Sequence, residues 1–307
     1  MNRLHFTLDP TPPFRLDLTV WVLRRRPDNA IDRWDGETYR RALVVGDAAV
    51  DVAVRQTTPA DRPRLEVAVD GAAPGLRADI AGALARILGT RVDLAGFYAA
   101  AADDPRLGPL ARRFRGVKPP RLPSVFECLV NAIACQQVTL TLGIRLLNRL
   151  AGAYGAPGPA GTARAFPAPG LLAAAPADDL RSLGFSRNKA RAIRDLAAAV
   201  AGGDLDLEGL ATLDDGAAVA RLCALWGIGR WSAEYVLLRG LGRLHVFPGD
   251  DVGARNNLCR WLGLAAPLDY AGVREVLAPW ARYGGLLYFH LLLDRLAAAG
   301  HVTAAPG

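Results

Sequence analysis

The chain has 307 residues, of which 51% are hydrophobic and 22% are charged. At about 150 residues per domain, this length is enough for two compact domains, and the composition excludes a disordered, collagen-like or repeat protein. Lysine and arginine outnumber aspartate and glutamate by 37 to 30, so the net charge is +7. This charge favours a polyanionic partner such as nucleic acid. Only Lys118 and Lys189 are lysines, so few side chains are available for amine chemistry.

The cysteines and the N-terminal segment indicate a soluble cytoplasmic protein. Cys128, Cys135, Cys223 and Cys259 lie 7, 88 and 36 residues apart, a spacing that suits neither a zinc site nor an iron–sulfur cluster. We therefore expect buried free thiols in a reducing compartment. Residues 1–14 carry charges and three prolines instead of the apolar core of a signal peptide.

The first 90 residues predict a small sheet. Apolar and other side chains alternate over Phe14–Val22, Val50–Val54 and Leu65–Val69, which is the period of half-buried strands. Over Leu76–Ile87 the apolar residues recur at helical spacing, and Gly89 marks the end of this helix. We expect an antiparallel sheet backed by at least one helix.

Beyond Gly89 the strand-like alternation disappears and the periodic segments are helical. The basic, proline-rich segment Arg112–Arg121 is expected to be an exposed connector, because its prolines prevent helix propagation. Ser124 and Glu127 form an S-x-x-E capping box at the start of the next helix. The later helices are expected over Ser186–Val200, up to about Leu225, up to Leu238, over Val252–Leu262 and over Tyr283–Ala299.

The pattern predicts an α+β protein with two parts. Residues 1–92 form an N-terminal antiparallel sheet-plus-helix domain, and residues 93–307 form an all-helical region. We expect this region to have two lobes, about 123–245 and 246–300, with a cleft between them.

The most informative segment is the turn Gly227–Gly229 between two predicted helices. Glycines allow positive φ in such a turn, and the first backbone N–H groups of the following helix have no partner within the helix. A DNA phosphate fits there because a helix N-terminus carries partial positive charge, so the turn can hold the backbone without reading sequence. An ordinary tight helix–helix connection is the alternative.

Two carboxylates, Asp250 and Asp251, follow the turn Pro248–Gly249 and open another predicted helix. An aspartate at a helix start is most often an N-cap, which stabilises the helix by about 1 kcal/mol. Capping explains one carboxylate but not the second, which the helix dipole keeps ionised. The second carboxylate is therefore a candidate for charged chemistry.

The segments G-I-G-R-W-S-A at 227–233 and P-G-D-D-V-G at 248–253 together resemble the helix-hairpin-helix DNA glycosylases with a downstream catalytic aspartate. Within that superfamily the sequence is most similar to the DNA-3-methyladenine glycosylase II (AlkA-type) proteins. The similarity runs from about Leu76 to Ala299. It is supported by Leu122–Glu127, Ala134–Thr139, Leu183–Phe185 with Lys189–Ala190, and Pro279–Tyr283.

The resemblance implies a monofunctional glycosylase that flips alkylated bases, such as 3-methyladenine, out of duplex DNA and hydrolyses the N-glycosidic bond in base excision repair. It assigns the catalytic carboxylate to Asp251 and makes Asp250 the capping neighbour. Trp231 occupies the position of the Schiff-base lysine of lyase-competent relatives, and neither Lys118 nor Lys189 replaces that lysine. Water is therefore the expected nucleophile, and the strand stays uncut.

The resemblance also implies an aromatic base pocket. Trp231 and Tyr235, at i and i+4, project from one helix face, and Phe289 or Tyr288 supplies the other ring. Stacking and cation–π attraction to an electron-poor alkylated base contribute about 1–2 kcal/mol each. An aromatic pair packed into the core is the alternative.

The DNA-binding residues implied by the resemblance lie at the hairpin and at one glutamine. Gln137 matches the side chain that fills the gap left by the flipped nucleotide, with Gln136 as the alternative. The hairpin residues are Gly227, Ile228, Gly229 and Arg230.

The sequence departs from the family pattern in two places. Trp226 stands where proline is usual and is expected to change the angle at which the chain enters the hairpin. Phe289 stands where tryptophan is common and is expected to change base preference.

Two functions are alternatives to a monofunctional alkylated-base glycosylase. An oxidised-base glycosylase with lyase activity is disfavoured by the absent hairpin lysine, and a catalytically silent damage-binding protein is disfavoured by the Asp-Asp helix start. The expected partner is double-stranded DNA containing damaged bases, bound by a monomer that is nucleoid-associated and attached to no membrane. No cofactor is expected, although the resemblance leaves room for a monovalent cation at the hairpin.

Overall fold

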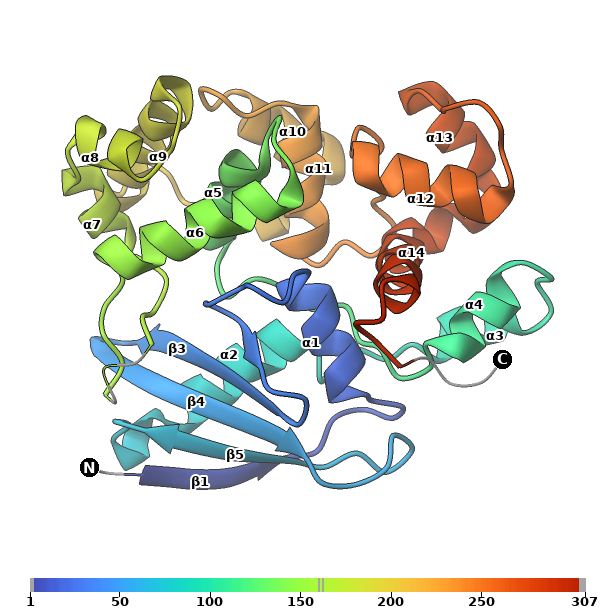
Figure 1. Ribbon diagram of the computed structural model, residues 1–307, viewed down its shortest axis with the longest axis horizontal. Coiled ribbons are helices and arrows are strands. Elements are labelled where there is room, and N and C mark those ends of the chain that lie inside the picture. The colour runs from blue at the N-terminus through green and yellow to red at the C-terminus, as the bar shows by residue number, and fades with distance from the viewer. Residues whose placement is uncertain (1–2, 160, 162, 304–307) are drawn as a thin grey trace.

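The computed structural model describes residues 3–159, 161 and 163–303. Five strands form one antiparallel sheet (Figure 1). The two predicted regions include residues 1–2 and 304–307, which lie outside the described residues. The sheet order is β1-β5-β4-β3-β2. The strands are β1 (Arg3–Leu8), β2 (Arg33–Trp34), β3 (Thr38–Val45), β4 (Ala48–Gln56) and β5 (Leu65–Asp70).

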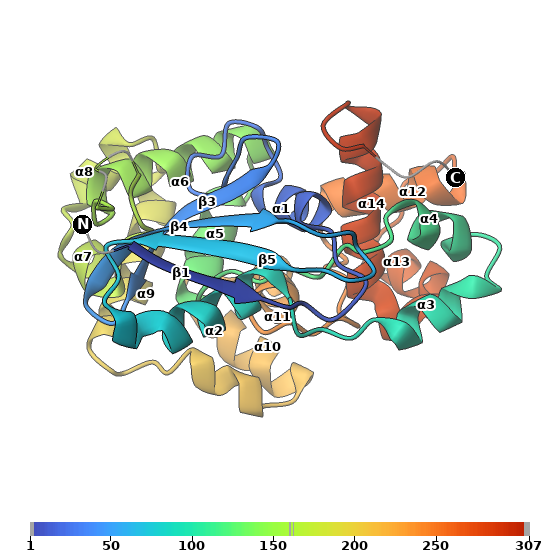
Figure 2. The ribbon, with the colours of Figure 1, turned by 90° about the horizontal axis from the view of Figure 1, so that it is seen from below.

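The register shows why these segments form a sheet. Val52 pairs with Val69 and Val54 with Val67, and all four side chains are buried on one face. Figure 2 shows this sheet from below, with α2 lying alongside it. The predicted antiparallel sheet and the α+β fold class are confirmed.

Helices make up most of the remaining described residues. They are α1 (Leu16–Arg24), α2 (Arg77–Leu88), α3 (Ala95–Ala102), α4 (Leu107–Arg113), α5 (Val125–Cys135), α6 (Leu140–Tyr154), α7 (Pro169–Ala174), α8 (Ala177–Ser182), α9 (Arg187–Ala201), α10 (Asp215–Cys223), α11 (Arg230–Arg239), α12 (Val252–Leu262), α13 (Tyr270–Val276) and α14 (Gly284–Ala298). Short 3-10 turns lie at Pro74–Leu76, Glu208–Thr212 and Ala278–Tyr283. Figure 1 places α5–α11 above the sheet and α12–α14 to their right.

The prediction of a strand over Phe14–Val22 is wrong, because this segment contains helix α1. One side of α1, including Leu16 and Val20, packs into the core shared by the sheet and α5–α11. The other side, including Leu18 and Trp21, packs into a second core with α3, α4 and α12–α14. The apolar residues at 14, 16, 18, 20 and 22 alternate as in a strand, but every residue of α1 except Asp17 is buried, so this alternation does not mark a half-buried strand.

The prediction of an exposed connector over Arg112–Arg121 is also wrong, because much of this segment is buried. Its N-terminal end belongs to α4, and the backbone N–H of Lys118 donates to the Thr19 hydroxyl on α1. The Lys118 ammonium donates to Val92 O at 2.6 Å, and burial lowers the pKa of Lys118 to about 8. Prolines stop a helix but do not require exposure.

The prediction of buried thiols is correct for two of the four cysteines. All four cysteines are free, and Cys128 and Cys259 are buried. Cys135 is half-buried and Cys223 is exposed, so the prediction is wrong for these two. Cys223 is the last residue of α10, where the chain leaves the core for the hairpin turn.

A buried ionic network joins the sheet to the helical region. The Arg41 guanidinium of β3 is inaccessible to solvent and contacts Asp32 Oδ1 at 2.7 Å and Glu127 Oε1 of α5 at 2.5 Å. Ser124 Oγ accepts the Glu127 N–H as predicted, but the Glu127 carboxylate goes to Arg41 instead of returning to the Ser124 N–H. The expected capping box is therefore only half formed.

Glu127→Gln tests this network. The substitution removes one of the two carboxylates that accept from the buried Arg41 and leaves the Arg41–Asp32 pair, so we expect the free energy of unfolding to fall by about 2 kcal/mol. Chemical denaturation measures this loss. Glu37→Gln, which breaks the exposed pair with Arg55, is the control and should cost less than about 1 kcal/mol. Equal losses in the two variants would contradict a structural role for the buried network.

Candidate active site

The turn between α10 and α11 has one glycine in the left-handed region. Gly227 has φ +81°, and a Cβ there would lie 3.2 Å from the Ala192 Cβ. Gly229 has φ −105° and ψ 179°, an extended conformation open to any residue, so the expectation of positive φ is wrong for it. Gly229 is also the N-cap of α11 and has no side chain to satisfy the first N–H groups of the helix. These groups are available to an anion.

Gln136 holds the turn against the end of α5. Its Nε2 donates to Gly227 O and to Ser232 Oγ, both at 2.9 Å. Gln137, the next residue, is exposed and has φ +52°, which is uncommon for a residue other than glycine. Of the two glutamines, Gln136 is therefore engaged within the protein, and Gln137 projects from its surface.

Helix α11 also holds the loop that carries the two aspartates. Glu234 Oε2 accepts the Gly249 N–H at 3.0 Å, and its Oε1 accepts the Tyr270 hydroxyl at 2.6 Å. At the start of α11, Arg230 pairs with Asp250 at 2.7 Å, and its guanidinium lies 3.6 Å from the centre of the Tyr270 ring. Two contacts thus tie the hairpin helix to this loop.

Asp251 is the half-buried N-cap of α12, and both its oxygens are engaged. Oδ1 accepts the Ala254 N–H at 2.9 Å, and Oδ2 accepts the Tyr288 hydroxyl of α14 at 3.2 Å. The assignment of the cap to Asp250 is wrong, because the Asp250 side chain turns to Arg230. Burial and the adjacent Asp251 charge raise the pKa of Tyr288 well above its usual value, so this hydroxyl stays a donor.

The predicted aromatic residues lie in two pairs, one on α11 and one on α14. The Trp231 and Tyr235 rings lie 5.6 Å apart on α11, with Trp231 half-buried and Tyr235 buried. On α14, Phe289 is almost completely buried and meets the Tyr288 ring edge-on at 5.6 Å. Tyr288 is the one of this α14 pair that contacts the carboxylate.

Sequence reasoning missed a buried polar group behind Tyr235. Arg25, just after α1, donates to the Tyr235 hydroxyl at 3.0 Å and to Asn131 Oδ1 at 2.8 Å. The Tyr235 hydroxyl donates to the same Asn131 oxygen at 2.9 Å, and Arg239 lies 5.7 Å from the Tyr235 ring centre. Arg25 stands within a run of three arginines, so nothing in the sequence marks it as buried.

Both lysines lie outside α11 and donate to backbone carbonyls. Lys118 is buried against Val92, as described above. Lys189 of α9 donates to Ala134 O at 2.9 Å, and burial lowers its pKa. Each ammonium group is thus engaged by a backbone carbonyl.

Among residues 3–159, 161 and 163–303, no group of three His, Cys, Asp or Glu side chains gathers as a metal site. Within that same part of the chain, no helix is both long and apolar enough to cross a membrane.

Comparison with known proteins agrees with this architecture. Residues 130–282 match the family model described as HhH-GPD superfamily base excision DNA repair protein. The chain belongs to this superfamily. The family predicted from the sequence, the helix-hairpin-helix DNA glycosylases of the DNA-3-methyladenine glycosylase II type, is confirmed.

Three relatives show how far the similarity extends. A DNA-3-methyladenine glycosylase of Bacillus subtilis is 29% identical over 201 residues, covering 65% of this chain and 66% of the relative. The Bacillus subtilis protein YfjP is 34% identical over 137 residues, covering 45% and 47%. The chain thus spans about half to two thirds of these two relatives. DNA-3-methyladenine glycosylase 2 of Escherichia coli is 27% identical over 287 residues, covering 91% and 94%.

Solved structures extend the similarity to nearly the whole chain. The 3-methyladenine DNA-glycosylase from Archaeoglobus fulgidus superposes with a TM-score of 0.82 at 27% identity, covering 95% of this chain and 98% of that one. An 8-oxoguanine glycosylase/lyase from Clostridium acetobutylicum has a TM-score of 0.71 at 15% identity and 94% and 95% coverage, which shows a shared fold alone.

A side chain added at Gly227 would contact Ala192, whereas one added at Gly229 would meet no atom. Substituting each glycine therefore tests the described turn. Gly227→Ala forces a non-glycine residue to φ +81° against Ala192, so we expect the free energy of unfolding to fall by about 2 kcal/mol. Gly229→Ala adds a methyl group in open space and should change it by no more than about 0.5 kcal/mol. Thermal or chemical unfolding distinguishes the two, and the opposite order would contradict the described turn.

Proposed function

We propose that this protein is a monofunctional DNA glycosylase of base excision repair, which flips alkylated bases such as 3-methyladenine out of duplex DNA and hydrolyses the N-glycosidic bond. The observation that carries the proposal is the Asp251 carboxylate, held by a backbone N–H and a tyrosine hydroxyl. It lies on a loop clamped to the helix that begins at the hairpin turn. The names of the relatives and the family assignment support this activity.

Duplex DNA would be held at two places. The open N-terminus of α11 at Gly229 offers backbone N–H groups to a phosphate, which positions the duplex independently of sequence. Gln137 projects from the surface beside the turn, where its side chain can occupy the gap left by the flipped nucleotide. Gln136 instead supports the turn through Gly227 and Ser232.

The flipped base would enter beside Trp231, Tyr235 and Tyr288. Alkylation at a ring nitrogen makes a purine cationic, and aromatic faces attract cations by about 1–2 kcal/mol each. A base that is already cationic leaves as a neutral molecule, so the site needs no general acid to protonate it. Burial raises the pKa of Tyr235 to about 12, so this ring stays neutral.

Asp251 would act on the sugar as the bond breaks. Its charge stabilises the oxocarbenium ion that develops as the base departs, and it orients or deprotonates the attacking water. The Tyr288 hydroxyl and the Ala254 N–H restrict the rotation of the carboxylate, so it is positioned before the substrate arrives. The base leaves with the bonding electrons and water supplies the new C1′–O bond, giving an abasic site.

Water is the proposed nucleophile because no amine is placed to attack the sugar. Trp231 occupies the hairpin position where lyase-competent relatives place a lysine, and both lysines are bound to backbone carbonyls elsewhere. The product strand therefore remains intact. A monomeric, cytoplasmic, nucleoid-associated state and a hairpin without a cofactor stay predictions of the sequence.

Asp251→Asn tests the catalytic assignment. Asparagine caps a helix as well as aspartate does, so the fold should persist while the charge is lost. We expect single-turnover excision to fall by at least about 100-fold, with duplex binding retained. Asp250→Asn breaks the pair with Arg230 and is the matched control, with an expected loss below about tenfold. A larger loss in Asp250→Asn would move the catalytic role to the neighbouring carboxylate.

Trapping with borohydride tests the nucleophile. An attacking lysine would form a Schiff base with the opened sugar, and reduction would fix the protein to DNA. We expect no trapped adduct, and strand cleavage only after hot alkali. A trapped adduct that disappears in Lys189→Ala would overturn the monofunctional assignment.

A further inference from the structure

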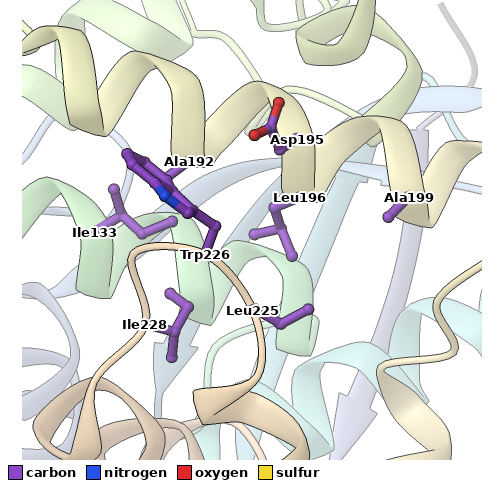
Figure 3. Close-up of a pocket in the computed structure, with 8 residues that line it drawn as sticks. All are labelled: Ile133, Ala192, Asp195, Leu196, Ala199, Leu225, Trp226 and Ile228. Carbon is purple, nitrogen blue, oxygen red and sulfur yellow. The ribbon is translucent and has the colours of Figure 1, made fainter.

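Trp226 is a large exposed side chain placed directly before the hairpin. It retains 43% of its accessible surface, although it precedes Gly227, whose turn is proposed to meet a phosphate. Part of the indole covers a small apolar cavity of about 90 Å³ between α9 and the turn (Figure 3). The cavity walls include Ile133, Ala192, Leu196 and Ile228. The contact with this cavity explains why part of the indole is buried. It does not explain why a large aromatic side chain is exposed at this position.

A guanidinium group completes the exposed surface. Arg191 of α9 lies 4.4 Å from the centre of the Trp226 ring, and its side chain is 61% exposed. Its Nε donates to Asp195 Oδ2 at 3.2 Å, while its terminal Nη groups donate to no protein atom in the described part of the chain. The stacking fixes the plane of the guanidinium and leaves its outer N–H groups available to an anion.

The surroundings of this pair are basic and adjoin the proposed DNA surface. The first two turns of α9 carry Arg187, Lys189 and Arg191 without an acidic residue. Lys189 joins α9 to Ala134 near the end of α5, and Gln136 joins that end to Gly227. The start of α9, the exposed Gln137 and the hairpin turn therefore form one continuous surface.

The geometry points to a second DNA-backbone contact at Arg191 and Trp226. Arg191 pairs with the phosphate next to the one held by the hairpin turn, and the exposed part of the indole packs against the deoxyribose between them. Phosphates follow one another at every nucleotide, so a cation beside the turn meets the adjoining one. This inference rests on the proposed function and adds a residue pair to its DNA surface.

The charge of the surface selects DNA as the occupant. An exposed apolar group that docks a protein is usually part of a wider apolar patch, whereas Trp226 is bordered by Arg191, whose Nε alone is taken up by Asp195. An arginine with free outer N–H groups suits a phosphate. The pair carries no base-reading donor at a fixed position, so it contributes affinity without sequence preference.

Binding to a duplex with an abasic-site analogue, measured over a salt series, tests the inference. Arg191→Gln should weaken binding about fivefold and reduce the slope of log affinity against log salt by about 0.9, the value for one phosphate. Trp226→Ala should weaken binding about fivefold with little change in slope, because it removes apolar contact. Undamaged duplex should be affected equally in both variants. Arg40→Gln, an exposed arginine of β3, is the control and should match the wild type.

The outcomes separate the inference from the function it rests on. Wild-type protein that fails to bind DNA would reject the proposed function itself. Wild-type binding with an unchanged affinity and slope in Arg191→Gln would reject this contact and leave Trp226 as the cover of the cavity. Thermal unfolding of each variant checks the fold. If Trp226→Ala unfolds, Trp226→Leu keeps the cavity covered and gives the same test.

Discussion

Helix α11 is the constraint on which the site depends, because it connects the turn that would hold DNA to the carboxylate that would act on it. Its first residue, Arg230, pairs with Asp250, and Glu234 one turn later accepts the Gly249 N–H. The loop that leads into Asp251 therefore has little freedom relative to the hairpin. Because a misplacement of 1 Å can cost about 100-fold in rate, such rigidity matters for a group that must meet one bond of a bound duplex.

The sheet and α1 also support this region. Arg25, next to α1, fixes the hydroxyl of Tyr235 together with Asn131, and the Arg41–Glu127 pair fixes α5 against the sheet. Both guanidinium groups are buried, Arg41 against two carboxylates and Arg25 against neutral oxygens, so removing a partner leaves buried N–H groups without an acceptor. The sheet and α1 thus support the predicted aromatic residues, although they contribute no residue to the predicted site.

The sequence predicts the parts whose chemistry needs particular residues at particular spacings. The positive φ of Gly227 and the aspartate cap at the start of α12 are of this kind, whereas Trp231 is marked only by the family resemblance. The sequence does not predict parts decided by tertiary packing. Helix α1 is buried on both sides although its apolar residues alternate as in a strand, and Arg25 is one arginine in a run of three. Which of two adjacent aspartates caps α12 depends on the position of Arg230, which spacing alone does not give.

The most direct test of the account is to incubate methylated duplex DNA with the protein and identify by chromatography what is released. The account predicts free alkylated purines, 3-methyladenine among them, and a strand that carries abasic sites but no breaks. Release of oxidised bases with strand cleavage, or binding without release of any base, would contradict it.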